Sequence, residues 1–410
     1  MSGYDAPGVH IAEDLSDDPS APACTPCLFG RAARGPVGEP TRIESPADFD
    51  RVFGAAAGST GSTGSTGSSG TGDAAGTERS PGFLADAVRG FFANQGRACY
   101  VCRVGDDPAT RPAPEAYERA LDGFADAAVA PEVELLAFPD AFERDPSAPR
   151  DAARTIFAAA LRHAESTARL AVLDAPPQDP ATTPAELARR ADDLAAFAGE
   201  LQSSHAALYA PWLEVEAGAA KRLVPPSGHV LGCYARTEEA DGLGGVPGNV
   251  QLHGTTGPAL SFEPDAQPKL APAGVNYAVR DALLGTRLWG ARTTSPDDPW
   301  RFVPPRRVVN RVQRGLRSQL SWLATESNDE STWNRATEAA RDFLRPLWKQ
   351  GALYGSEERD AFLVHCGLGA TMSPDDVAAG RLRLAVQLAA SRPGELVELS
   401  FEWGLGGASG

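Results

Sequence analysis

Cysteine, histidine and serine are the residues whose types and spacing could do chemistry in this sequence. The cysteines form two C-x-x-C pairs, Cys24 with Cys27 and Cys99 with Cys102, a spacing that zinc sites use. A low-complexity tract separates the pairs, and the second pair lies in a predicted strand, where positions i and i+3 face opposite sides. We therefore expect buried, reduced thiols, with a shared zinc site as the alternative.

A second candidate is Ser227 with His229, in the segment PPSGH. A serine–histidine pair also needs an acid that orients the histidine, and neighbouring positions alone do not make a triad. The motifs G-x-S-x-G, the P-loop and H-E-x-x-H are missing, and GLGG at 242–245 lacks the third glycine of a dinucleotide motif. The sequence predicts no catalytic, cofactor-binding or metal-ligating residue. A hydrolase built on an α/β scaffold is the enzyme alternative.

Composition limits the partner classes. The 410 residues carry a net charge of −16, and 42% of them are hydrophobic. Nucleic-acid binding is disfavoured, because phosphates need a basic surface. No apolar run reaches the roughly 18 residues of a membrane span, and the acidic N-terminus lacks the basic and apolar regions of a secretory signal. We expect no membrane insertion and assembly in the cytoplasm.

Strand-like and helix-like segments alternate over residues 26–236. Buried strands are expected at 98–104, 133–140, 169–176 and 205–215, and helices at 83–96, 117–128, 150–167 and 183–201. This alternation predicts the α/β class, a parallel sheet with helices on its faces. Ser45-Pro46 begins a further short helix, with Ser45 as its N-cap.

Composition shifts also divide the chain into domains. We expect an N-terminal arm (1–25), an α/β domain (26–273) with a disordered Gly/Ser/Thr loop (54–80), a C-terminal α+β domain (274–394) and a C-terminal arm (395–410).

Two helices are expected in the C-terminal domain. The first, at about 306–323, has one apolar face and an opposite face that carries Arg306, Arg307, Arg311, Arg314 and Arg317. On an acidic protein, such a face is either a solvated surface or a docking surface for an acidic partner, and the pattern leaves both open. The second helix, at about 328–351, contains a proline at position 346, which should kink it or end it early.

The last segment, ELVELSFEW, alternates apolar and polar residues. Its apolar side chains share one face: Val397, Leu399, Phe401 and Trp403. A strand at a chain end can pair within its own sheet or add to the edge of a neighbour's sheet, and the pattern does not decide between them.

Taken in order, several segments resemble the contractile tail sheath family, which includes phage tail sheaths and the sheaths of phage-derived contractile injection systems. The segments are PGVHIAED, FGRAARGPVGEPTRIESPADFDRVFG, VRGFFANQGRACYVCRV, ALYAPWL, VPPSGHVLGCYART, GVNYAVRD, LWGARTTSPDDPWRFVPPRRV and FLRPLWKQGALYG. The likeness covers nearly the whole chain outside 54–80 and 237–273. Pro346 is a departure, because a small residue is expected there. Without a large outer decoration domain, the chain is most similar to injection-system sheaths.

The resemblance implies a structural subunit without a cofactor. The α/β domain would be similar to a subtilisin-like fold without protease residues, and the C-terminal α+β domain would face an inner tube. Subunits would form a homo-oligomer of stacked rings or a helix around that tube. Baseplate and cap proteins would be further partners, as would paralogous sheath subunits where present. The two arms would add strands to neighbouring subunits, with Val9 and Ile11 in the N-terminal arm and Val397, Leu399, Phe401 and Trp403 in the C-terminal arm.

The resemblance also implies a mechanism, in which an extended, metastable sheath contracts and drives the tube through a target envelope. In that setting, our hypothesis is that the arginine face of the 306–323 helix, or the helix after it, contacts an acidic tube. A terminal or baseplate-proximal ring subunit is the alternative within the family.

Overall fold

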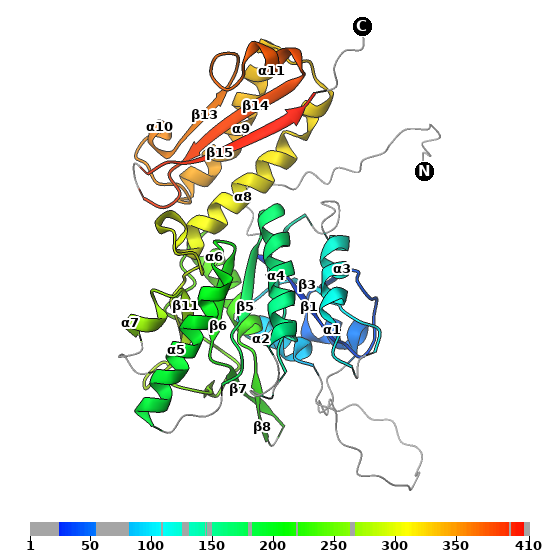
Figure 1. Cartoon of the computed structure of the whole chain (residues 1–410), viewed down its shortest axis with the longest axis vertical. Helices are drawn as coiled ribbons and strands as arrows, with labels where there is room; N and C mark the ends of the chain where they lie inside the picture. The colour runs from blue at the N-terminus through cyan, green and yellow to red at the C-terminus, as the bar shows by residue number, and fades with distance from the viewer. Residues whose placement is uncertain are drawn as a thin grey trace.

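The computed structural model describes residues 24–54, 82–107, 110–124, 131–143, 145, 150–178, 183–218, 220–262, 267–392 and 395–405. The expected N-terminal arm up to residue 23, with Val9 and Ile11, lies outside the described residues. So does the expected loop at 54–80, apart from Gly54. The described residues form a larger and a smaller domain, one above the other in Figure 1.

A nine-stranded sheet runs through the larger domain in the order β2-β3-β1-β4-β5-β6-β11-β12-β9. Its strands are β1 (Thr25–Gly30), β2 (Thr41–Ile43), β3 (Cys99–Arg103), β4 (Val133–Ala137), β5 (Leu170–Asp174), β6 (Ala206–Ala210), β9 (Val250–Gln251), β11 (Val275–Asp281) and β12 (Gly285–Trp289). The six strands from β3 to β11 in this order are parallel, and β2, β12 and β9 pair antiparallel at the edges. Every residue of β4, β5 and β6 is buried, which explains why these strands are apolar apart from Glu134 and Asp174.

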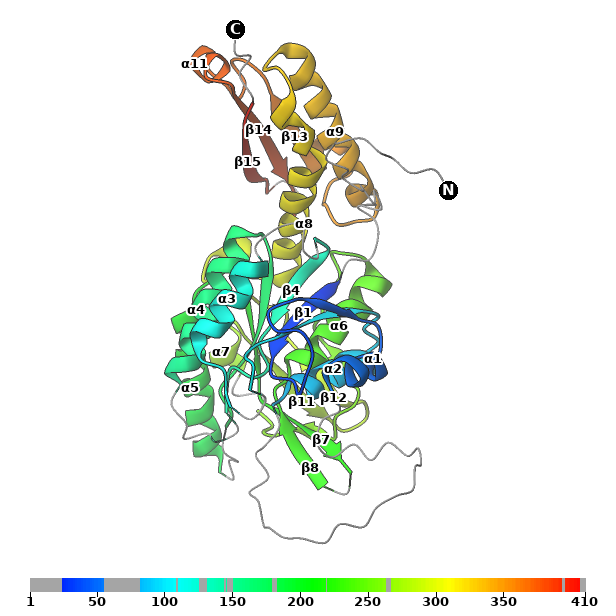
Figure 2. The same cartoon turned by 90° about the vertical axis from the view of Figure 1, so that its right-hand side faces the viewer.

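Helices cover both faces of this sheet, so the mixed α/β prediction is confirmed. The helices are α1 (Pro46–Phe53), α2 (Leu84–Ala93), α3 (Pro114–Phe124), α4 (Asp151–Ser166), α5 (Pro184–Leu201), α6 (Ser227–Asp241) and the short α7 (Gln267–Leu270). Figure 2 shows α3, α4 and α5 on one face and α1, α2 and α6 on the other. The predicted cap at Ser45 is confirmed, because its side chain accepts a hydrogen bond from the Asp48 N–H at 3.1 Å.

Two glycines allow α6 to pack closely against α2. A Cβ atom on Gly228 would lie 2.2 Å from the Ala87 carbonyl oxygen, and one on Gly232 would lie 2.4 Å from the Phe91 carbonyl oxygen. Both obstacles are backbone atoms, which cannot rotate away. The glycines that give this segment a low helix propensity are therefore required by tertiary packing.

Two parts of the larger domain differ from the sequence prediction. The strand expected at 205–215 is two strands, β6 and β7 (Leu213–Ala217), and β7 forms a three-stranded sheet with β8 (Ala220–Val224) and β10 (Gly257–Pro258). The expected boundary at 273/274 is wrong, because β11 pairs with β6 in parallel and β12 follows it in the same sheet.

The smaller domain packs two long helices against a three-stranded antiparallel sheet, in the order β13-β14-β15. Its elements are α8 (Val303–Gln319), the 3-10 helix η3 (Ser321–Thr325), α9 (Glu330–Lys349), α10 (Glu358–Ala361), β13 (Phe362–Cys366), α11 (Pro374–Ala378), β14 (Arg381–Leu388) and β15 (Val397–Gly404). A 3-10 turn, η2 (Asp298–Trp300), precedes α8. Among the described residues, no helix is long and apolar enough to cross a membrane.

The C-terminal segment and the proline of α9 both differ from the sequence prediction. The segment expected as a separate C-terminal arm is largely β15, which pairs along its whole length with β14 of its own chain. Pro346 does not end its helix early, because α9 continues to Lys349. The proline lies in the last turn, where the Gln350 N–H still donates to the Pro346 carbonyl at 3.0 Å.

Candidate functional site at the domain junction

Helix α8 connects the two domains and contributes to both hydrophobic cores. Val303, at its start, belongs to the core of the larger domain. Val308, Val309, Val312 and Leu316 belong to the core of the smaller domain. The predicted division of this helix into an apolar and an arginine face is therefore correct, and the apolar face packs on the smaller domain.

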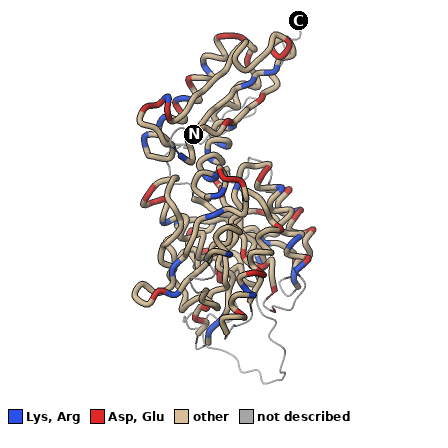
Figure 3. Tube along the Cα trace, turned by 60° about the vertical axis from the view of Figure 1, so that its left-hand side comes forward, with Lys and Arg blue, Asp and Glu red and all other residues tan. Residues whose placement is uncertain are grey.

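The arginine face is not the exposed surface that we expected. Arg306, Arg307 and Arg311 are 5%, 3% and 8% exposed, and the Arg314 side chain is mostly buried. These four guanidiniums contact the larger domain, so the expectation that they form an exposed docking face is wrong in this structure. Only Arg317, in the last turn of α8, is exposed. Figure 3 shows basic and acidic residues interspersed along the trace of both domains.

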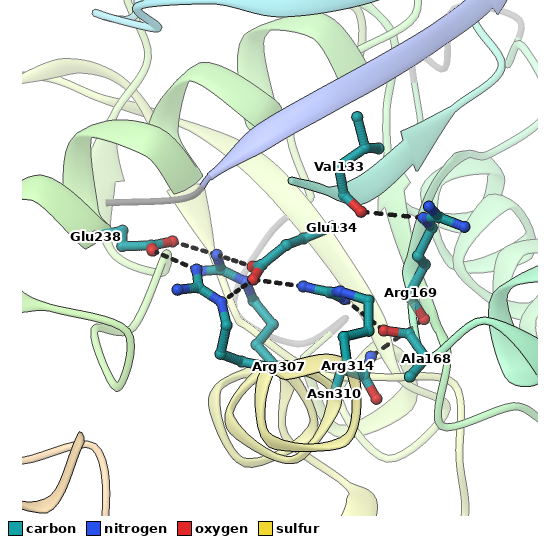
Figure 4. Close-up of polar contacts among 9 residues, drawn as sticks. Val133, Glu134, Ala168, Arg169, Glu238, Arg307, Asn310 and Arg314 are labelled. Carbon is teal, nitrogen blue, oxygen red and sulfur yellow. Dashed lines mark hydrogen bonds and ion pairs between the residues drawn. The ribbon is translucent and has the colours of Figure 1, made fainter. Parts of the chain in front are cut away.

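Glu134, the second residue of β4, binds three of these arginines (Figure 4). The Arg314 guanidinium donates to it at 2.6 Å and the Arg307 guanidinium at 3.3 Å, and the Arg311 Nε–H donates to the same carboxylate. The Glu134 side chain is only 4% exposed. Burial alone would raise its pKa, but the three guanidiniums outweigh burial and lower the pKa to about 2.

Glu238, in the last turns of α6, is the second buried carboxylate. It accepts a hydrogen bond from Arg307 and another from Arg311 at 3.3 Å. Its side chain is 3% exposed. We call Glu134, Glu238, Arg307, Arg311 and Arg314 the junction cluster. Because its charges are paired and hydrogen-bonded, burial is tolerated, whereas the loss of one partner would leave an uncompensated charge.

Arg306 contacts the larger domain through a histidine. Its guanidinium lies 3.6 Å from the centre of the Trp300 ring and 3.2 Å from the Nε2 atom of His205. The Nδ1 atom of His205 lies 2.7 Å from the Arg169 carbonyl oxygen, so Nδ1 carries the hydrogen and Nε2 accepts from Arg306. Burial and the Arg306 charge both lower the pKa of His205, which keeps the ring neutral.

A neighbouring contact repeats this arrangement between Arg169 and His163. The Arg169 guanidinium donates to the Val133 carbonyl at 3.0 Å and lies 3.3 Å from the His163 Nε2 atom. Burial, together with the Arg169 charge, lowers the pKa of His163 to about 4. Two hydrogen bonds to backbone carbonyls add to the junction, from Asn310 to Arg169 at 3.1 Å and from Arg314 to Ala168 at 2.5 Å.

All of these contacts lie at one edge of the parallel sheet. Arg169 and His205 directly precede β5 and β6, and Glu134 is at the start of β4. We call this the amino edge. The opposite, carboxyl edge is where α/β enzymes bind ligands, at the point where the strand order reverses. In this sheet that point lies between β1 and β4.

A buried aspartate occupies the carboxyl edge at this point. Asp140 accepts hydrogen bonds from the Phe83 N–H at 2.5 Å and the Arg31 N–H at 2.7 Å. A Cβ atom on Gly30 would lie 2.5 Å from its Oδ2 atom. The carboxylate is thus used to satisfy backbone donors and is packed against the end of β1.

The serine and histidine of PPSGH do not form a triad. Ser227 is fully buried, and its N–H donates to Asp174, the last residue of β5, at 2.7 Å. Burial raises the pKa of this aspartate to about 7. His229 points elsewhere, with its Nε2 atom 3.4 Å from the Gly254 carbonyl oxygen. The base required beside a nucleophilic serine is therefore not in place.

The two C-x-x-C pairs do not form a metal site. Burial raises the pKa of all four thiols, Cys24, Cys27, Cys99 and Cys102, above the usual range. Within the described part of the chain, no group of three or more Cys, His, Asp or Glu side chains could hold a metal ion.

Sequence reasoning missed the two carboxylates that the arginines bind. Glu134 is the one charged residue in the buried strand VELLA, which is a usable signal, since a buried charge needs a partner. The i, i+4, i+7 spacing of Arg307, Arg311 and Arg314 is the matching signal. The sequence cannot join the two, because Glu134 and Arg307 are 173 residues apart.

Comparisons with known proteins agree on one family. The model of the phage tail sheath C-terminal domain matches residues 295–373. A putative prophage major tail sheath protein of Pseudomonas aeruginosa (strain UCBPP-PA14) is 29% identical over 203 residues, which is 47% of this chain and 49% of that protein. The chain thus aligns with about half the length of this relative.

Solved structures extend the likeness to nearly the whole chain. The sheath of an extracellular contractile injection system, PVC, in its contracted state has a TM-score of 0.69 at 27% identity, with 98% of each chain covered. A chain of the anti-feeding prophage baseplate also has a TM-score of 0.69, at 25% identity, with 97% of this chain and 99% of that chain covered.

Proposed function

Because the chain belongs to the contractile tail sheath family, we propose that it is a structural subunit of the contractile sheath of a phage-tail-like injection system. The observation that carries this proposal is the full-length match to the PVC sheath, since both chains are covered almost completely. Both domains and the junction between them therefore have counterparts in a sheath protein.

The subunits polymerise around an inner tube in an extended, metastable state, and contraction drives the tube through a target envelope. The partners are further copies of this chain, the tube protein, and baseplate and cap proteins, with paralogous sheath subunits where a particle has them. Assembly takes place in the cytoplasm. Similar chains occur in a sheath complex and in a baseplate, which supports further copies of this chain and baseplate proteins as partners.

The subunit works as a scaffold and not as a hydrolase. The α/β domain is a non-catalytic relative of the subtilisin-like fold, which the mostly parallel sheet with helices on both faces supports. At the carboxyl edge, Asp140 and Asp174 accept hydrogen bonds from backbone N–H groups, and the Nε2 atom of His229 faces the Gly254 carbonyl oxygen. These carboxylates and Ser227 are therefore unavailable for acid–base or nucleophilic chemistry.

The smaller domain offers two sheet edges for contacts between subunits. β13 and β15 form the outer strands of its sheet, so each has one row of backbone groups without a partner in that sheet. The Leu399 and Phe401 side chains of β15 are buried in the core of the smaller domain, so their predicted contact with a neighbouring subunit is wrong in this structure. We keep the partly exposed Val397 and Trp403 of β15, with Val9 and Ile11 of the N-terminal segment, as candidates for contacts between subunits. Of the five arginines first assigned to the tube, only Arg317 is exposed and remains a tube-facing candidate.

A second function, a terminal ring next to the baseplate, is favoured by the similarity to a chain of the anti-feeding prophage baseplate. Negative-stain electron microscopy of the chain, alone and with its candidate tube protein, tests both functions. We expect long hollow cylinders, or sheathed rods that depend on the tube. Single rings that never stack would establish the terminal-ring function. A monodisperse monomer under both conditions would overturn the proposal.

A further inference from the structure

The junction cluster fixes the position of α8 on the larger domain more narrowly than hydrophobic packing would. Arg307, Arg311 and Arg314 occupy successive turns on one face of α8, and all three reach the single carboxylate of Glu134. Glu238 binds two of them from a different element, α6. The helix is thus held from a strand and from a second helix at once.

A shift of α8 would disrupt several of these bonds together. A slip by one residue rotates the arginine face by about 100°, and a slip by one turn moves it by about 5.4 Å along the axis. Either slip leaves buried guanidiniums and carboxylates without partners, which is costly in a site that excludes water. A purely apolar junction has no comparable requirement, because apolar contacts are not directional.

The orientation of the smaller domain depends on α8, because the opposite face of that helix belongs to the core of the smaller domain. Val308, Val309, Val312 and Leu316 pack there with the inner face of the sheet. A small rotation at the junction therefore becomes a larger displacement at the far end of β15. A polymer of identical contacts requires every subunit to present its surfaces at the same angle.

We propose that Glu134 is a positioning residue that selects one angle between the two domains, and that this single angle is what permits subunits of this chain to polymerise. The link between this angle and polymerisation rests on the proposed function. The effect of Glu134 on the angle concerns the subunit alone. Replacing buried ionic clusters with apolar residues often leaves stability unchanged, so stability and orientation can be separated by experiment.

The test compares the wild-type chain with E134Q and with the triple variant E134M/R311M/R314M. R317M is the matched control for the distance measurement alone, because Arg317 is itself a candidate for contact with the tube. The triple variant removes one carboxylate and two guanidiniums and leaves Arg307 paired with Glu238. R317M changes an exposed arginine of the same helix. Nitroxide labels are placed at two exposed positions, R119C on α3 and N334C on α9, in a C366S background. Distances are measured by double electron–electron resonance on labelled full-length chain diluted in unlabelled chain.

We expect one narrow distance in the wild type and in R317M. The triple variant should keep its thermal midpoint but broaden the distribution at least about twofold, and E134Q should broaden it as well. If a folded triple variant keeps the wild-type distance and width, the proposal is overturned. If the triple variant does not fold, the same result in E134Q overturns it. Electron microscopy of the same samples should show at least about threefold less assembled material for the broadened variants. Undiminished assembly despite a broadened distance would overturn the link to polymerisation.

Failure of the proposed function gives a different result. If the wild-type chain forms no cylinders under any condition, the sheath function is contradicted. The distance measurement still decides whether Glu134 sets the angle between the domains, because it reports on the subunit itself.

Discussion

The two edges of the parallel sheet use buried charge in opposite ways. At the amino edge, Glu134 meets three guanidiniums, and its pKa falls to about 2. At the carboxyl edge, Asp174 accepts a hydrogen bond from the Ser227 N–H and meets no guanidinium in the described part of the chain, and burial raises its pKa to about 7. One edge joins two domains through ion pairs between side chains, and the other closes the ends of strands with carboxylates bound to the backbone.

This difference fits the structural role that we propose for the chain. The carboxyl edge, where enzymes of this class bind ligands, is filled by Asp140 and by the start of α6. The amino edge, which usually has no functional role, carries the charged cluster that attaches the smaller domain. We infer that a domain class known for catalysis serves here as a platform for a second domain.

The largest expected effect comes from breaking the amino-edge cluster. Arg307→Ala removes the guanidinium shared by Glu134 and Glu238 and leaves both buried carboxylates with fewer partners. We expect a loss of about 3–5 kcal/mol in the free energy of unfolding, measured in urea. Arg317→Ala, on the exposed side of the same helix, should change it by less than about 0.5 kcal/mol. Similar losses in the two variants would contradict the difference between buried and exposed arginines.

A change at the carboxyl edge should instead stabilise the protein at higher pH. Burial raises the folded pKa of Asp174 from its ordinary value of 3.8 to about 7, so its stabilising contribution is complete below pH 3.8 and is lost as the pH rises through 7. Asp174→Asn does not titrate. Relative to the wild type, this variant should gain on the order of 2–4 kcal/mol between pH 4 and pH 8. Urea unfolding of both proteins across this pH range measures the gain. A difference in the free energy of unfolding that stays constant with pH would contradict the prediction.

At the amino edge, the pH dependence should have the opposite sign. His163 has a folded pKa lowered from 6.5 to about 4, so its contribution is present above pH 6.5 and is lost as the pH falls toward 4. His163→Gln keeps an acceptor for Arg169 but cannot be protonated in this range. As the pH falls from 6.5 to 4, the free energy of unfolding of this variant should decrease by about 2 kcal/mol less than that of the wild type. Equal slopes in thermal melts from pH 7 to pH 4 would show that His163 is not responsible.

Burial raises the pKa of the other carboxyl-edge aspartate, Asp140, as well, but both of its oxygens accept hydrogen bonds from backbone N–H groups. We therefore expect the loss of one of these bonds to outweigh the gain from removing the charge. Asp140→Asn replaces one oxygen with an NH2 group, which would face either the Phe83 N–H or the Arg31 N–H. We expect a loss of about 1–2 kcal/mol at pH 8, where Asp174→Asn should give a gain. Urea unfolding of the two variants side by side provides the comparison. Changes of the same sign would mean that the two aspartates do not differ in this way.

Much of the fold could be predicted from local patterns. The central strands and the helices between them follow from apolar runs and helical periodicity, and the Ser45 cap was predicted correctly. Helix α6 was not predicted, because Gly228 and Gly232 lower its intrinsic propensity and are explained only by their contact with α2. The β7–β8 hairpin was also missed, since the first of its strands follows β6 after only two residues.

The arginines of the candidate site could be predicted from the sequence, but their partners could not. The helical wheel correctly separates the arginines of α8 from its valines and leucines. Periodicity identifies a polar face but not what covers it, and arginine is rarely buried without a partner. Glu134 supplies that partner from a strand far away in the sequence, and pattern alone cannot place such a strand against a given helix face. The direction of the arginine face therefore required the tertiary structure.

The smallest effect should come from an exposed ion pair in the smaller domain. Arg383 on β14 lies opposite Glu402 on β15 and donates to it at 2.9 Å, with side chains 44% and 52% exposed. Glu402→Gln keeps the shape and removes the charge. Water and salt already screen this pair, so its loss should be about a quarter or less of that for Arg307→Ala. Urea unfolding at low and high salt measures it, with Glu398→Gln as control because Glu398 faces the uncharged Gln387. A loss as large as that of Arg307→Ala, unchanged by salt, would mean that burial does not explain the importance of the junction cluster.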